Sequence, residues 1–164
     1  MIDTQPGMEE RVQWCHGAPS ALPVFALAWK IYKETKYLEA ADLAAEYTYR
    51  YGVLVKGMSL CHGTSANMYM IHYLYSITNN PKYLYYVQQM LILTLNTPTL
   101  SDPSLMVSYD CLGSHSAFVD SAAAAIGTFA DLLGELDGTG EGVWMLGWGK
   151  PTIKSQYKGS KFLE

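Results

Sequence analysis

Apolar residues dominate two stretches of the chain so nearly completely that little polar surface would remain on a helix built from them. These stretches are residues 21–34 and 66–77. Helices that are apolar on almost every side are buried on most sides. We therefore expect two inner helices at these positions. Pro23 lacks a backbone N–H, so we place it in the first turn of the first inner helix, where that loss is tolerated.

Each inner helix is followed by a segment that suits an outer helix. In residues 38–51 the charged residues recur at spacings of three and four, which gives an amphipathic helix with one polar stripe. Gly52 then suits the end of this helix. Residues 83–95 form the second outer helix, which has few strongly polar positions and is expected to be covered by another part of the protein. The stripe consists of Glu39, Asp42, Glu46 and Arg50.

The remaining segments divide the chain into two parts. Asn79, Asn80 and Pro81 predict a turn, and residues 96–103, with two prolines, predict a loop. A third hairpin begins near residue 117, with an alanine-rich helix that ends at 133. Residues 134–149 contain six glycines. We therefore expect a helical-hairpin domain over residues 1–133 and an irregular glycine-rich tail over residues 134–164.

A sequence repeat supports this pairing of helices. The run Cys-His-Gly occurs at residues 15–17 and again at 61–63, an offset of 46 residues. The run Lys-Tyr-Leu at 36–38 recurs at 82–84 with the same offset. A period of this length is typical of helical-hairpin repeats, in which each unit needs its neighbours to complete a core. The chain is thus predicted to be all-α and part of a larger ring or solenoid.

Composition narrows the classes of function. The 164 residues are 49% hydrophobic and 16% charged, with a net charge of -4. No strongly basic patch indicates nucleic-acid binding, and no run of about 18 apolar residues predicts a membrane span. The polar N-terminus does not resemble a secretory signal. We expect a cytoplasmic protein, with peripheral membrane association left open, in which the three cysteines are thiols or ligands.

The repeated cysteines are candidate metal ligands. Equivalent positions in adjacent repeats are spatial neighbours, and packed helices lie about 8–10 Å apart. Cys15, Cys61 and His62 could therefore share one zinc ion. Two cysteines and one histidine leave a fourth position open, which is the arrangement of a catalytic rather than a structural site. The alternative is that the cysteines are small buried apolar residues.

Two motifs carry a resemblance to a known family. Residues 14–19 read Trp-Cys-His-Gly-Ala-Pro, and residues 56–64 read Lys-Gly-Met-Ser-Leu-Cys-His-Gly-Thr. Together with residues 117–133 they resemble the eukaryotic branch of the lanthionine synthetase C-like (LanC-like) family over residues 12–133. The resemblance implies an all-α fold, an α/α toroid of inner and outer helices of which this chain would form roughly the C-terminal half.

The resemblance also implies a function. Family members hold zinc at the positions of Cys15, Cys61 and His62, bind glutathione, and add a thiol to dehydroamino acids in a peptide or protein to form a thioether. The family lysine that contacts glutathione matches Lys56, for which the alternative is an ordinary solvated lysine.

Three hypotheses stay open at this stage. No histidine precedes Cys15, whereas the histidine taken as the family's proton donor lies upstream of the first cysteine, so we assign no catalytic residue. The first hypothesis, which follows from the resemblance, is that the chain is a thioether-forming enzyme. The alternatives are a truncated, non-catalytic remnant that binds zinc or glutathione, and a helical-repeat scaffold for protein partners.

Overall fold

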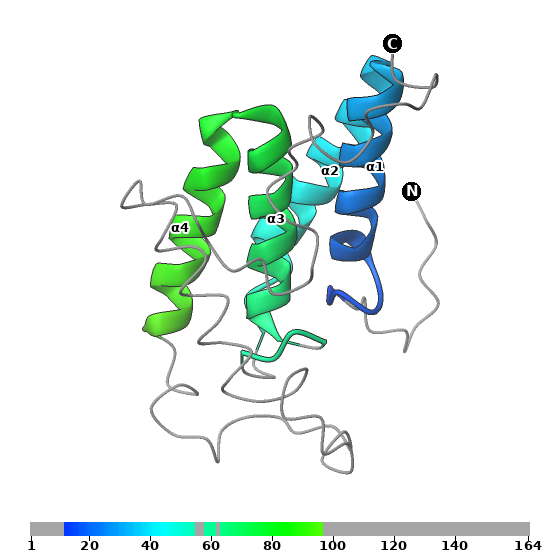
Figure 1. The fold of residues 1–164 in the computed structure, drawn as a ribbon. Coiled ribbons are helices and arrows are strands. Elements are labelled where there is room, and N and C mark those ends of the chain that lie inside the picture. The colour runs from blue at the N-terminus through cyan, green and yellow to red at the C-terminus, as the bar shows by residue number, and fades with distance from the viewer. Residues whose placement is uncertain (1–11, 55–57, 62, 97–164) are drawn as a thin grey trace, which may run out of the picture.

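Four helices form the part of the protein that the structure describes. The computed structural model describes residues 12–54, 58–61 and 63–96. In chain order the helices are α1 (Ala18–Tyr32), α2 (Thr35–Tyr51), α3 (Thr64–Thr78) and α4 (Pro81–Leu95), and these residues contain no strand (Figure 1). The all-α prediction is therefore confirmed. The predicted third hairpin and the glycine-rich tail lie outside the described residues.

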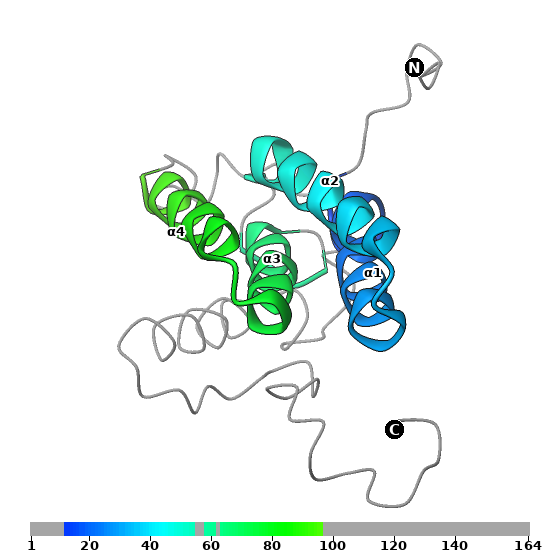
Figure 2. The same ribbon diagram turned by 90° about the horizontal axis from the view of Figure 1, so that it is seen from above.

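The helices form two hairpins arranged in two layers. Helix α1 packs on α2, α3 packs on α4, and α1 lies against α3. Viewed from above, α2 and α4 lie on one side of the pair formed by α1 and α3 (Figure 2). This is the predicted arrangement of inner and outer helices. No helix in the described part of the chain is long and apolar enough to cross a membrane.

The structure reproduces the repeat of 46 residues at the helix boundaries. Helix α3 begins and ends 46 residues after α1, and α4 begins 46 residues after α2. The inner helices also end in the same way: Lys33 and Asn79 both adopt left-handed backbone angles, with φ of 58° and 53°. Each donates its N–H to the carbonyl four residues earlier, which closes the last turn. The repeat in sequence is thus a repeat in backbone geometry.

The helices begin two or three residues earlier than the apolar pattern predicts. Helix α1 begins at Ala18, so Pro19 occupies the first turn and Pro23 lies inside the helix. The placement of Pro23 in the first turn was therefore wrong. Pro81, assigned to a turn, is the first residue of α4, where a missing N–H has no cost because the first N–H groups have no partner in the helix.

The core lies between the two layers. Ala41, Ala45 and Thr48 are the buried residues of α2, opposite its charged stripe, and the small size of the two alanines allows close packing. Tyr49 of α2 and Tyr86 of α4 stack with ring centroids 4.1 Å apart and join the outer helices. The buried apolar side chains of this main core cluster are Leu22, Ala26, Ala41, Ala45, Met68, Tyr69, Met70, Ile71, Tyr73, Leu74, Tyr83, Val87 and Met90.

The two inner helices differ in burial. Every residue from 64 to 74 of α3 is buried, as predicted. Helix α1 instead exposes Val24, Leu27 and Ile31, which are 64%, 44% and 49% exposed and lie on one side of the helix. The prediction that both inner helices are buried on most sides is wrong for α1, because a described hairpin precedes α3 in the array and none precedes α1.

Gly52 ends α2 as predicted, but for a different reason than expected. Its φ is −92°, so no left-handed conformation is required. Its N–H donates to the Thr48 carbonyl at 2.7 Å. A Cβ at this position would clash with that same carbonyl oxygen. Glycine is needed here because the chain passes too close to the helix end for any side chain.

Candidate functional site

Cys15 lies at the tip of a four-residue turn just before α1. The backbones of Gln13 and His16 exchange two hydrogen bonds of 3.0 Å, which close the turn around Trp14 and Cys15. Gly17 then caps α1 with φ of 110°, a backbone conformation that residues other than glycine rarely adopt. The turn therefore holds the half-buried Cys15 sulfur three residues ahead of the helix.

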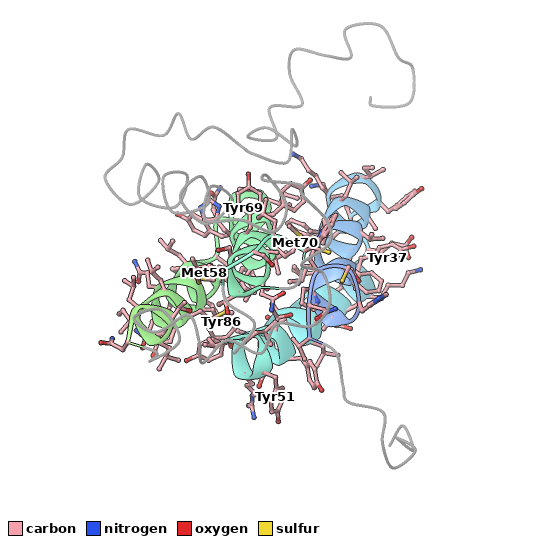
Figure 3. The ribbon with its side chains drawn as sticks, turned by 90° about the horizontal axis from the view of Figure 1, so that it is seen from below. Tyr37, Tyr51, Met58, Tyr69, Met70 and Tyr86 are labelled. Atoms are coloured by element: carbon pink, nitrogen blue, oxygen red, sulfur yellow. The ribbon has the colours of Figure 1, made fainter. Side chains whose placement is uncertain are left out.

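Cys61 occupies the equivalent place before α3. The Gly63 N–H donates to the Ser59 carbonyl at 3.1 Å, which closes this second turn. Gly63 has extended backbone angles, with φ of −103°, so the two caps differ although their sequences match. Cys61 is half-buried, like Cys15. Met58, just before this turn, packs against the core (Figure 3).

The two turns lie at the same end of the molecule and contact each other. Helices α1 and α3 lie side by side and both begin at the lower end of Figure 1. Trp14, which precedes the first cysteine, packs against the small cluster formed by Ala66 and by Leu60, which precedes the second cysteine. The structure thus brings the two CHG turns together, as the repeat predicts.

Asn67 fixes the chain around these turns. Its side-chain Nδ2 donates to the Val12 carbonyl at 2.8 Å and to the Gly52 carbonyl at 2.9 Å. Asn67 is completely buried, and its Oδ1 has no hydrogen-bond partner among the residues that the structure describes. The residue therefore joins the first turn, the end of α2 and the start of α3.

The side chain of Gln13 contacts one of the predicted ligands. Its Nε2 donates a hydrogen bond to the Cys15 sulfur at 3.1 Å, and Gln13 itself is only 3% exposed. Sequence analysis did not single out Gln13, since a hydrogen bond between residues two apart depends on the shape of the turn. The role of Asn67 was also missed, although a polar residue inside an apolar helix is a signal that a buried group needs partners.

The predicted site residues fall into two groups. Cys15 and Cys61 are both half-buried and lie in adjoining turns. His62 and Lys56 lie outside the described residues. Among the residues that are described, no three histidine, cysteine or acidic side chains gather at one point. The histidine that follows the first cysteine, His16, closes the turn through its backbone and is exposed.

The chemistry of the two thiols fits a zinc ion. Cysteine sulfur is a preferred zinc ligand, and two cysteines can share one ion when their segments lie close together. The turns of Cys15 and Cys61 immediately precede α1 and α3, which pack against each other. The N-terminal ends of α1 and α3 lie at the same end of the molecule and carry partial positive charge, which favours anionic groups there.

The family assignment rests on a comparison with known protein families. The model of the family described as lanthionine synthetase C-like protein matches residues 3–100 of the 164-residue chain. The chain belongs to the lanthionine synthetase C-like family. The match includes both CHG turns and all four helices, so this LanC-like chain carries its two cysteine turns within the part that defines the family.

A curated relative agrees with this assignment. The protein named glutathione S-transferase LANCL1 from Danio rerio is 42% identical to the LanC-like chain over 74 residues. Those residues make up 45% of this chain and 18% of the relative. The similarity therefore spans less than a fifth of the relative's length, and the relative's name describes that whole protein.

Proposed function

We propose that this LanC-like protein binds zinc and glutathione and adds the glutathione thiol to dehydroamino acids, forming a thioether. The observation that carries the proposal is the proximity of the two CHG turns, in which Trp14 of the first turn packs against the cluster of Leu60 and Ala66 around the second. The name of the Danio rerio relative supports glutathione as the thiol.

Each proposed ligand has a defined place in the chain. Cys15 and Cys61 would hold the metal with His62, which leaves one position for the incoming thiol. Bound zinc would supply the Lewis acidity that keeps a thiol deprotonated at neutral pH. Lys56 is proposed to pair with a carboxylate of glutathione, and the positive ends of α1 and α3 favour the same anionic ligand.

The reaction adds a thiol across a carbon–carbon double bond. The sulfur forms a bond to the β-carbon of the dehydroamino acid, and the electron pair of the double bond moves toward the α-carbon. A proton then adds to the α-carbon, so that the elements of the thiol are added and nothing is oxidised or reduced. This last step needs a general acid, and we assign no residue of this chain to it.

Metal content of the purified chain tests the proposal. We expect about one zinc per chain by plasma mass spectrometry, and its loss in each of the variants Cys15→Ala, Cys61→Ala and His62→Ala. Cys111→Ala is the matched control, because this third cysteine lies outside both CHG motifs. A folded chain without zinc would refute the metal site.

A second experiment tests the reaction itself. The zinc-loaded chain is mixed with glutathione and a dehydroalanine peptide, and the thioether product is followed by mass spectrometry. We expect product with the unchanged chain and none with Cys61→Ala. Zinc binding without product would favour the non-catalytic interpretation for this chain.

A scaffold function is favoured by a separate observation. The apolar side chains Val24, Leu27 and Ile31 are exposed along one side of α1, and exposed apolar patches commonly mark contact sites for other proteins. In this interpretation the chain contains no zinc, and Cys15→Ala leaves its partner binding unchanged. The metal measurement therefore separates the two functions.

A further inference from the structure

We infer that Gln13 is a positioning residue for the Cys15 sulfur, a role that rests on the zinc site proposed above. The side-chain Nε2 of Gln13 donates to the Cys15 Sγ at 3.1 Å. Gln13 is buried, with 3% exposure, whereas Cys15 is half-buried, so the donor is held inside the protein while the sulfur stays partly accessible.

The backbone gives this contact a fixed geometry. Gln13 and His16 exchange two backbone hydrogen bonds of 3.0 Å, so the position of Gln13 relative to Cys15 is set by the turn. Val12, the preceding residue, is itself held by the Asn67 side chain at 2.8 Å. The backbone of Gln13 is therefore fixed by its own hydrogen bonds to His16 and by the bond from Asn67 to the preceding residue. This fixes the point from which the Gln13 side chain extends to the sulfur.

The chemistry of sulfur explains why such a donor matters. A thiol is a weak hydrogen-bond acceptor, whereas a metal-bound sulfur carries negative charge and forms stronger, charge-assisted bonds. A buried amide N–H directed at Cys15 thus matches the metal-bound form of the side chain. Groups that hydrogen-bond to metal ligands orient them and tune the metal.

The repeat shows that this contact belongs to the first cysteine. The position 46 residues after Gln13 is Ser59, whose shorter side chain carries no amide. Ser59 closes its own turn by accepting from the Gly63 N–H at 3.1 Å. The equivalent position in the second repeat therefore cannot supply a glutamine amide to its cysteine.

The test compares the whole chain with two variants at residue 13. Gln13→Met keeps an unbranched side chain of similar length but removes the donor, and Gln13→Glu keeps the shape but turns a carboxylate toward the sulfur. Gln89→Met makes the same chemical change on α4, away from the turns, and is the matched control. Zinc affinity is measured by chelator competition, and the sulfur-to-metal charge-transfer band is measured in the cobalt-substituted chain.

We expect both variants at residue 13 to bind zinc about 10- to 100-fold more weakly than the unchanged chain, with a shifted cobalt band. Gln89→Met should match the unchanged chain in both measurements. Unchanged affinity and an unchanged band in Gln13→Met, or in Gln13→Glu if the first variant does not fold, would overturn the role of Gln13 and leave the zinc site standing. An unchanged chain that binds neither metal would refute both proposals.

Discussion

The side-chain Nδ2 of Asn67 donates a 2.8 Å hydrogen bond to the backbone carbonyl of Val12, 55 residues earlier in the chain. The same nitrogen donates to the Gly52 carbonyl at 2.9 Å. One buried amide thus connects three segments that are distant in sequence. The position of the first cysteine turn depends on a side chain in the second repeat.

Replacing Asn67 should destabilise the protein strongly. Asn67→Ala leaves the carbonyls of Val12 and Gly52 without their donor, and an unsatisfied buried polar group costs about 1–3 kcal/mol. We expect a loss of about 2–4 kcal/mol in the free energy of unfolding, measured by urea denaturation. Asn96→Ala removes an exposed side-chain hydrogen bond to Ile92 and is the control, with an expected change within about 0.5 kcal/mol. Equal effects at the two positions would contradict this account.

The two cap glycines should respond differently to alanine. Gly17 has φ of 110°, where a Cβ is strained, and Gly63 has φ of −103°, which any residue adopts. Gly17→Ala is expected to cost about 1–3 kcal/mol in unfolding free energy from backbone strain. Gly63→Ala should have no such backbone cost. Thermal unfolding of both variants checks this order. A larger loss of stability in Gly63→Ala would show that the space available for the added Cβ, and not the backbone angle, determines the cost of the substitution.

Helix α1 should become more stable when its interior proline is removed. Pro23 is the sixth residue of the helix, where it withholds an N–H from the Pro19 carbonyl. Pro23→Ala restores that bond but also raises the chain entropy of the unfolded state. We expect the free energy of unfolding to rise by about 1–3 kcal/mol in total.

Pro19→Ala is the control for this prediction. Pro19 lies in the first turn, where its missing N–H has no partner to lose, so the change should give no gain. Urea midpoints and helix content by circular dichroism measure both variants. The prediction fails if Pro23→Ala lowers the midpoint.

The contact between α2 and α4 should weaken at alkaline pH. Asp42 accepts from Lys82 at 2.6 Å and from the Tyr83 hydroxyl at 3.0 Å. Burial and the neighbouring Asp42 raise the pKa of Tyr83 above its ordinary 10.0. Partial burial would lower the pKa of Lys82, but the hydrogen bond and charge of Asp42 raise it above 10.5 overall.

The raised pKa values of Tyr83 and Lys82 decide whether stability rises or falls with pH. A pKa that is higher in the folded than in the unfolded chain contributes stability that is complete below the unfolded value and is lost as pH rises toward the folded value. We therefore expect the free energy of unfolding to decline from about pH 10 upward. Urea denaturation between pH 7 and pH 11 measures this decline. It should be smaller in Tyr83→Phe, and an equal decline would place its origin elsewhere.

The exposed ion pair itself should contribute little at neutral pH. The side chains of Lys82 and Asp42 are 36% and 39% exposed, and such pairs are worth about 1 kcal/mol or less. Asp42→Asn should therefore lower the free energy of unfolding at pH 7 by no more than this amount, and less in high salt. A loss of several kcal/mol, independent of salt, would mean that Asp42 has a structural role beyond the pair.

The sequence predicts helix type and order well but helix starts poorly. Apolar periodicity indicates where a helix contacts the core, and two of the helices begin with polar residues: Thr35 begins α2, and Thr64 and Ser65 begin α3. Such residues are absent from an apolar pattern, so the starts of these two helices are predicted too late. The repeat of 46 residues gave the correct pairing, because it does not depend on which residues are apolar.

Burial of the inner helices could not be predicted from their own residues. Val24 and Leu27 of α1 are apolar and exposed, whereas Met70 and Tyr73, 46 residues later, are buried in α3. Burial depends on which element lies beside a helix, and this information is outside the local pattern. In the same way, the CHG motif predicted the cysteine turns, but the partners of Gln13 and Asn67 required the folded backbone.

The constant offset of 46 residues between the two hairpins has a consequence for how such a chain can change in size. Residues 18–63 contain one inner helix, one outer helix and the turn that follows, and the residue after them begins α3 as Ala18 begins α1. Removing or duplicating this segment would join a glycine cap to an inner helix at the same register. The protein could thus shorten or lengthen by a whole hairpin through a single recombination event, because each junction would still place a glycine cap before an inner helix.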